Sequence, residues 1–171
     1  MDLPKRKRTR LLGYDYSQNG AYFITICTHE HKQILSKIRV GAIHESPELI
    51  LTHYGKIVEQ IIKSLPDRFD ISVDKYVIMP NHIHLIISVF NQQERAIHEL
   101  PLHSRSTISN AIGYLKMNVS KEIHKTNCNK KVWQRSFHDH IIRNEHDYEE
   151  IWQYIDNNPL KWESDCFYCE K

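Results

Sequence analysis

The sequence predicts an α+β fold of ferredoxin-like type, in which helices pack on an antiparallel sheet. Segments rich in β-branched and aromatic residues occur among segments whose apolar residues recur at helical spacing. A Pro80-Asn81 turn lies between two strand-like segments and predicts a hairpin, with one helical segment before it and another after it. This order favours a sandwich with one layer of helices over one face of the sheet.

Length and composition indicate one globular domain. The chain has 171 residues, of which 40% are hydrophobic and 26% charged, as is typical of globular proteins. No apolar run approaches the roughly 18 residues of a membrane span, and no apolar signal segment follows the basic N-terminus. We therefore expect a cytoplasmic protein with a basic arm at residues 1–12, one domain at 13–165 and a tail at 166–171.

The first half of the chain is predicted to contain two strands and a helix. Residues 21–28 alternate in polarity and are rich in aromatic and β-branched side chains, which is typical of a strand. Residues 34–40 have the same character over a shorter stretch. Residues 47–65 fit a helix, because apolar side chains recur at helical spacing toward its end and Pro66 then terminates it.

The middle of the chain is predicted to form the hairpin and a long loop. Residues 71–79 and 82–90 have the composition of strands, and the turn between them makes them antiparallel neighbours. Residues 91–104 are polar and are expected to be a loop.

The last part of the chain is predicted to contain two helices and a strand. Residues 107–125 place apolar side chains on one helical face. Residues 132–143 have the character of a strand. Asn144 is a suitable N-cap for a final helix over residues 145–157, and Pro159 ends that helix.

Two histidines are spaced two positions apart in the second strand of the predicted hairpin. Alternate side chains of a strand share a face, so His82 and His84 project side by side with Cα atoms about 6.6 Å apart. Ile83, Leu85 and Ile87 then point to the opposite face, toward the core. Two imidazoles at this spacing can chelate one divalent cation. The alternative is a pair of partly exposed histidines on a solvent face.

The final predicted helix carries a tyrosine beside its apolar stripe. Tyr154 lies at the flank of that stripe, where its ring can pack while its hydroxyl reaches a groove. Asn158 follows four residues later and lies on the same face, one turn away. The two side chains can offer a hydroxyl and a carbonyl oxygen together. Alternatively, Tyr154 is an ordinary amphipathic residue and Asn158 terminates the helix before Pro159.

Basic residues are concentrated at the N-terminus, and the four cysteines form no recognisable framework. Basic arms often neutralise nucleic-acid phosphates, although a solvated tail is an equal alternative. Cys166 and Cys169 form one CxxC pair without a second pair at the spacing of a zinc site, so we expect reduced thiols. The arm consists of Lys5, Arg6, Lys7, Arg8 and Arg10.

Several motifs together resemble, in the right order, those of REP-associated tyrosine transposases. These proteins are IS200-like members of the HUH superfamily of single-strand nucleases that use one catalytic tyrosine. The resemblance runs from about residue 10 to residue 162. Its motifs are RLLGYDYS at 10–17, GAYFITIC at 20–27, MPNHIH at 79–84, WQRSF at 133–137, HIIRN at 140–144 and YIDNNPLKW at 154–162.

The resemblance implies a fold and a role for individual residues. The fold would be the HUH nuclease fold, an RRM-like antiparallel sheet with helices packed on it. His82 and His84 would be the two histidines of the HUH motif and would bind Mg²⁺ or Mn²⁺, with Asn158 as the third ligand. Tyr154 would be the nucleophile. No nucleotide cofactor is implied, and the chain has no GxxxxGK[ST] motif.

The resemblance also implies an activity and a partner. The protein would be a metal-dependent enzyme that nicks and rejoins hairpin-containing single-stranded DNA through a 5′-phosphotyrosine intermediate. It would be a monomer or a homodimer, in which the tyrosine helix serves its own subunit or its partner's. The basic arm, Arg135 and Arg143 would contact DNA phosphates. The alternatives are a replication or conjugation initiator of the same class, and a sequence-specific DNA-binding protein of this fold without catalysis.

Overall fold

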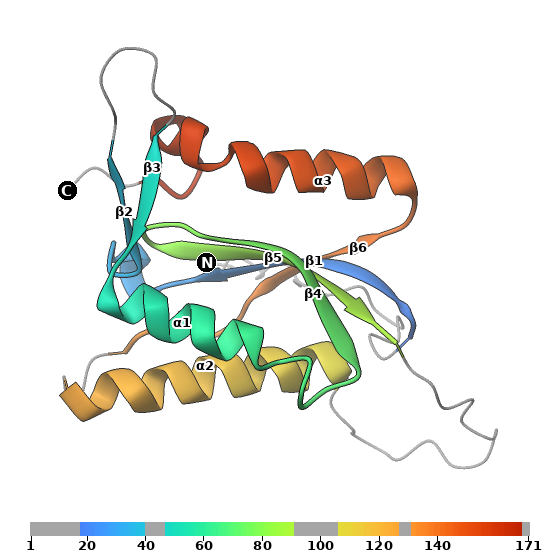
Figure 1. Cartoon of the computed structure of the whole chain (residues 1–171), viewed down its shortest axis with the longest axis horizontal. Coiled ribbons are helices and arrows are strands. Elements are labelled where there is room, and N and C mark those ends of the chain that lie inside the picture. The colour runs from blue at the N-terminus through green and yellow to red at the C-terminus, as the bar shows by residue number, and fades with distance from the viewer. Residues whose placement is uncertain (1–17, 40–46, 91–105, 127–130, 169–171) are drawn as a thin grey trace, which may run out of the picture.

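A four-stranded antiparallel sheet forms the middle layer of the structure, a computed structural model (Figure 1). Its central strands are β1 (Gly20–Cys27) and β5 (His82–Val89), and its edge strands are β4 (Ile71–Ile78) and β6 (His138–Ile142). Every neighbouring pair is antiparallel. Together with the helices that pack on this sheet, this confirms the predicted α+β fold class and the hairpin formed by β4 and β5.

The structure describes residues 18–39, 47–90, 106–126 and 131–168. The predicted basic arm and the predicted loop at 91–104 therefore lie outside the described residues. Within the four described ranges, no helix combines the length and the apolar composition that crossing a bilayer requires.

Helices cover both faces of the sheet rather than the one face expected from the sequence (Figure 1). Helices α1 (His53–Lys63) and α2 (Thr107–Thr126) share the larger core cluster with β1 and β5. Helix α3 (Glu145–Asn157) packs on the opposite face with a second, smaller cluster. The single-face expectation failed because β5 carries apolar residues at both alternations, and a strand buried on both faces needs a layer on each side.

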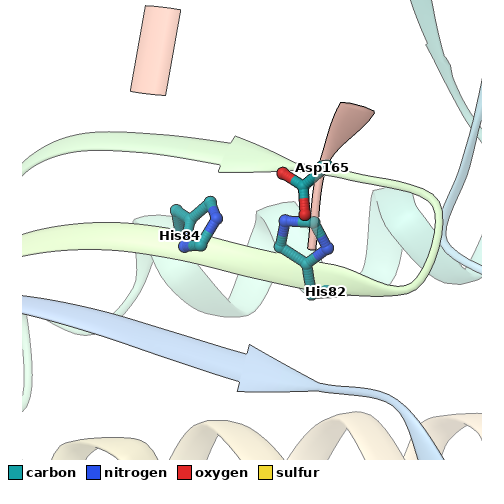
Figure 2. Close-up of side chains that lie close together, drawn as sticks. All are labelled: His82, His84 and Asp165. Atoms are coloured by element: carbon teal, nitrogen blue, oxygen red, sulfur yellow. The ribbon is translucent and has the colours of Figure 1, made fainter. Parts of the chain in front are cut away.

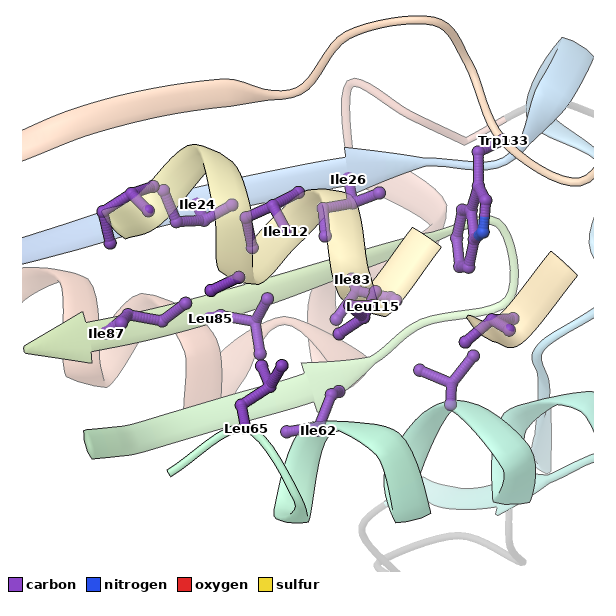
Figure 3. Packing of buried hydrophobic residues seen from close by; sticks show 14 of the residues in the cluster. Ile24, Ile26, Ile62, Leu65, Ile83, Leu85, Ile87, Ile112, Leu115 and Trp133 are labelled. Carbon is purple, nitrogen blue, oxygen red and sulfur yellow. The ribbon is translucent and has the colours of Figure 1, made fainter. Parts of the chain in front are cut away.

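Alternation along β1 and β5 builds the larger core. Figure 3 shows isoleucine and leucine side chains of both strands packed against α1 and α2. Ile83, Leu85 and Ile87 all lie in this cluster and are fully buried, as the sequence predicted. Burial of each such side chain stabilises the fold by about 1.5–3 kcal/mol relative to exposure. The opposite alternation of β5 is thereby directed toward α3.

The predicted helix at 47–65 is in fact a strand followed by a helix. Strand β3 (Glu48–Leu51) pairs with β2 (Ser36–Arg39) as a separate two-stranded ribbon, and α1 begins only at His53. Thr52 separates the two elements, because its side-chain oxygen accepts a hydrogen bond of 3.1 Å from the amide of Gly55 and so caps α1. The prediction of a helix from the spacing of apolar residues is correct only for the segment that follows Thr52.

The predicted strand at 132–143 is reduced to its second half. Trp133 forms only an isolated bridge with Thr28, and regular pairing begins at β6. The ammonium of Lys116 on α2 donates to the carbonyls of residues 134, 135 and 136, at 2.6, 3.3 and 3.2 Å. Those carbonyls accept hydrogen bonds from the Lys116 ammonium instead of from the amides of a neighbouring strand, which explains why β6 is shorter than predicted. Asn144 caps α3 as predicted, accepting from the amide of Asp147 at 2.8 Å.

Candidate active site

The two histidines of β5 lie side by side and are buried. His82 is 0% exposed and His84 is 1% exposed, and their ring centroids are 4.5 Å apart. Both project to the α3 face of the sheet, because they alternate with the core residues of β5. A pair of surface histidines, the alternative that the sequence left open, is therefore wrong.

His84 is held between β1 and α3. Its Nδ1 lies 2.9 Å from the hydroxyl of Thr25, the residue directly opposite on β1. Its Nε2 lies 3.3 Å from the hydroxyl of Tyr154. Phe23, two positions before Thr25, stacks on the imidazole with ring centroids 5.1 Å apart. These contacts fix both the position and the plane of the His84 ring.

One ring nitrogen of His82 has a hydrogen-bond partner, and the other has none among the described residues. Its Nδ1 lies 2.9 Å from Oδ1 of Asn81, while its Nε2 is buried and has no hydrogen-bond partner among the described residues. Burial lowers the pKa of His82 to about 4, and burial also holds the pKa of His84 well below its ordinary value. Both imidazoles are therefore neutral at pH 7, which is the state that binds metal ions.

Helix α3 places Tyr154 beside the histidine pair. The side chain is 42% exposed, with its ring edge-on to Phe23 at 6.0 Å between centroids. Burial, followed by the negative charge of Asp165, raises the pKa of Tyr154 to about 12. The phenol is therefore protonated at neutral pH, and its ionisation would be favoured by positive charge nearby.

Asn158 lies at the C-terminal end of α3, on the same side as Tyr154. It is 2% exposed, and its Nδ2 donates a hydrogen bond of 2.8 Å to Oδ2 of Asp165. Its Oδ1 is buried without a partner in the described part of the chain. A buried amide oxygen without a hydrogen bond raises the free energy of the folded protein. A cation bound to that oxygen would remove this penalty.

Asp165 is a site residue that the sequence did not reveal. A carboxylate oxygen of Asp165 and one ring nitrogen each of His82 and His84 all lie within 4.8 Å of one another (Figure 2). The short 3-10 helix η2 (Pro159–Ser164) turns the chain back over the sheet and brings this carboxylate to the histidines. No spacing rule links an aspartate to histidines 81 and 83 positions earlier, and a lone acidic residue is not a signal.

Aromatic residues on either side of Asp165 also contact the site. The ring of Phe167 lies 4.7 Å from that of His82 and 6.1 Å from that of His84, between centroids. Trp162 of η2 lies 6.0 Å from His82. These aromatic rings exclude water from one side of the histidine pair, which accounts for its burial.

The donor set fits a divalent cation. It combines two neutral imidazoles, which suit transition-metal ions, with an amide oxygen and a carboxylate, which suit Mg²⁺ and Mn²⁺. His82 Nε2 and Asn158 Oδ1 are also buried polar atoms without a protein partner in the described ranges. One cation bound among them would satisfy both atoms.

A cavity of about 530 Å³ opens beside the tyrosine. Its lining includes Tyr154, Asn158, Asp165 and Lys161. A second cavity of about 1020 Å³ lies between η2 and the β2–β3 ribbon and is lined in part by Lys37, with Lys161 again in its wall. Lys161 therefore lines both cavities.

Two of the arginines predicted to contact DNA are exposed but line neither of these cavities. Arg135 lies in the segment before β6, and Arg143 lies directly before the cap of α3. The remaining predicted contacts, Lys5 to Arg10 of the basic arm, lie outside the described residues. The structure thus brings His82, His84, Tyr154 and Asn158 together, whereas Arg135 and Arg143 line neither cavity beside them.

Sequence comparison gives one family and two curated relatives. Residues 16–158 match the family described as "Transposase IS200 like". A Haemophilus influenzae protein described as uncharacterized is 34% identical over 176 residues, covering 96% of this chain and 94% of that protein. A second Haemophilus influenzae protein, described as a candidate REP-associated tyrosine transposase, is 25% identical over 158 residues, covering 86% of this chain and 74% of that protein.

Structural comparison gives the same fold. A REP-associated tyrosine transposase bound to a REP hairpin superposes with a TM-score of 0.62 and 19% sequence identity, covering 90% of this chain and 74% of that one. The resemblance that the motifs indicated is therefore confirmed by family, relative and fold. The chain belongs to the IS200-like transposase family.

Proposed function

We propose that this protein is a transposase that cleaves and rejoins hairpin-containing single-stranded DNA, with Tyr154 as its nucleophile. The observation that carries the proposal is the Tyr154 hydroxyl, 3.3 Å from Nε2 of a buried, neutral His84. His82 and His84 would hold Mg²⁺ or Mn²⁺ together with the oxygen of Asn158, and Asp165 lies close enough to contribute. Such an ion, when bound, would polarise the phosphate that is attacked.

The proposed covalent step exchanges one phosphodiester for another. The Tyr154 oxygen attacks phosphorus and loses its proton, the bond from phosphorus to the 3′ oxygen breaks, and that oxygen gains a proton. The products are a 5′-phosphotyrosine and a free 3′-OH. Because the phosphoester is retained, a 3′-OH can reverse the step and rejoin DNA without a nucleotide cofactor.

Catalysis within one subunit is favoured by the position of the tyrosine. Tyr154 lies against the histidine pair of its own chain, so a monomer contains all four proposed residues. A homodimer in which each subunit works on its own is equally compatible with this arrangement.

Single-stranded DNA fits the surroundings of Tyr154. The cavity there is open, and its Lys161 offers a positive charge to a phosphate. The related structure with a REP hairpin supports a hairpin substrate. We propose that Arg135, Arg143 and the basic arm bind more distant phosphates, and that the protein acts on DNA in the cytoplasm.

Covalent capture of DNA tests the nucleophile. With Mn²⁺ or Mg²⁺, a 3′-labelled hairpin oligonucleotide is expected to give an adduct that resists SDS and migrates slowly on a gel. Tyr154→Phe is expected to lose the adduct completely, because it lacks the attacking oxygen. The matched control is Tyr148→Phe, which changes a tyrosine of the same helix that donates to Asp74 instead.

Two results would contradict the proposal. An adduct that persists in Tyr154→Phe would exclude this tyrosine as the nucleophile. Binding of every hairpin tried, without cleavage of any, would favour the alternative of a DNA-binding protein that has kept only the fold.

A further inference from the structure

We infer that Asp165 is a positioning residue, which orients the amide of Asn158 so that its oxygen faces the histidine pair. This inference rests on the proposed metal site and adds a residue to it. The family match ends at residue 158, so Asp165 lies beyond the segment that the family defines.

The amide of Asn158 has two ends of nearly equal size and opposite hydrogen-bonding character. A carboxylate only accepts hydrogen bonds, so it can face only the NH₂ end of an amide. Asn158 Nδ2 donates to Asp165 Oδ2 at 2.8 Å, and Asn158 Oδ1 consequently points away from Asp165. That oxygen is buried, and no other described residue bonds it.

Asp165 is itself held in place by the chain that follows. Its Oδ1 accepts a hydrogen bond of 2.7 Å from the amide of Phe167. The carbonyl of Phe167 in turn accepts one of 2.7 Å from Nδ2 of Asn81. Residues 165–167, which we call the clamp, are therefore fixed to the strand turn that precedes His82.

The clamp also sets the state of His82. Because Nδ2 of Asn81 is directed at Phe167, its Oδ1 is the end that faces Nδ1 of His82, at 2.9 Å. An amide oxygen accepts, so Nδ1 of His82 carries the proton. The lone pair is then on Nε2, the buried atom without a partner in the described chain. One short segment thus directs both an oxygen and a nitrogen lone pair into the site.

Removal of the Asp165 side chain should weaken metal binding, because the amide of Asn158 is then no longer oriented. Without Asp165, the amide can turn its NH₂ toward the ion, where it repels the cation. Partners that orient metal ligands typically change metal affinity 10–100-fold when mutated. Asp165 also lies near the histidines, so a test must separate orientation of Asn158 from direct binding of the ion by the carboxylate.

A double-mutant cycle on the full chain makes that separation. Mn²⁺ affinity is measured by calorimetry for wild type, Asp165→Ala, Asn158→Asp and the double variant. We expect Asp165→Ala to weaken binding about 10-fold or more. In the Asn158→Asp background, Asp165→Ala should leave the Mn²⁺ affinity unchanged, because both ends of a carboxylate are oxygens and either can bind the ion. Glu163→Ala, which removes an exposed carboxylate two residues away, controls for the loss of charge and should leave the affinity unchanged.

Each outcome of the cycle bears on the inference. Equal losses in both backgrounds would show that Asp165 binds the ion directly and would overturn the positioning role. An unchanged affinity of Asp165→Ala would also overturn it, provided that His82→Ala abolishes Mn²⁺ binding. If wild type binds no Mn²⁺, or His82→Ala binds it equally well, the proposed metal site fails and the inference fails with it. Recovery in the double variant excludes misfolding, since that protein carries the same truncation.

Discussion

At the scale of single residues, burial determines the protonation states around the histidine pair. It lowers the pKa of His82 to about 4 and raises that of Tyr154 to about 12, because in each case it disfavours the charged form. Both groups are therefore uncharged at pH 7. A site of neutral donors beside the Asp165 carboxylate attracts a cation, and a bound cation would favour the phenolate that attack requires.

Cys27 illustrates the same effect at a thiol. It lies opposite His82 in the sheet, and burial raises its pKa to about 11. Only about one thiol in a thousand is then ionised at pH 8. We expect iodoacetamide to label exposed Cys166 in the native protein at pH 8 while Cys27 remains unmodified until the protein unfolds. Mass spectrometry of the peptides measures both, and equal labelling of the two in the native state would contradict the burial of Cys27.

The raised pKa of Cys27 also makes stability depend on pH. The folded pKa of about 11 exceeds the ordinary thiol value of 9.0, so the unfolded chain loses this proton first. The contribution is fully present below pH 9 and is lost as pH rises through 11. The free energy of unfolding, measured by urea titration, should therefore fall less steeply over this range in Cys27→Ala than in wild type.

At the scale of elements, the start of α1 depends on a close approach of two backbones. The carbonyl of Leu35 accepts from both the amide and the hydroxyl of Thr52, at 2.9 Å each. A Cβ added at Gly55 would lie 2.1 Å from that carbonyl oxygen, far inside contact distance. The absence of a side chain at Gly55 allows the ribbon and α1 to join at this point.

Gly55→Ala is therefore expected to destabilise the protein by about 1–3 kcal/mol, the usual range for overpacking. Gly113→Ala is the matched control in α2, since its Cβ would meet nothing within 4 Å. That control should gain about 0.5–1 kcal/mol from helix propensity. Thermal unfolding measures both, and a Gly55→Ala protein as stable as wild type would disprove the close approach.

At the scale of the whole molecule, the site joins segments that are distant in the sequence. β5 supplies the histidines, α3 supplies Tyr154, and η2 returns the chain so that Asp165 reaches the pair (Figures 1 and 2). A cation bound there would link the central sheet to the C-terminal segment. Binding to the folded state alone raises its stability by mass action.

Mn²⁺ should accordingly raise the melting temperature. At 100 times its dissociation constant, a ligand adds about 2.7 kcal/mol. For a chain of this length that is an increase of several degrees, at about 2–4 °C per kcal/mol. EDTA should reverse the shift and His82→Ala should abolish it, whereas His146→Ala, at an exposed histidine of α3, should retain it. A shift that survives in His82→Ala would place the ion elsewhere.

The sequence alone determined the features that depend on neighbouring residues. Alternation put His82 and His84 on one face of β5 with Ile83 on the other, and helical spacing put Asn158, the C-cap of α3, one turn after Tyr154. Such patterns repeat within a few residues and reflect local backbone geometry. The family resemblance was also contained in these short motifs.

Features that depend on distant contacts could not be predicted from local patterns. The ribbon before α1, the shortened β6 and the second helical layer follow from partners elsewhere in the chain, namely β2, Lys116 and both faces of β5. Burial of the histidines and the arrival of Asp165 depend on the chain reversal at η2. No local pattern encodes these contacts, because their energy comes from surfaces that meet only when the whole chain is folded.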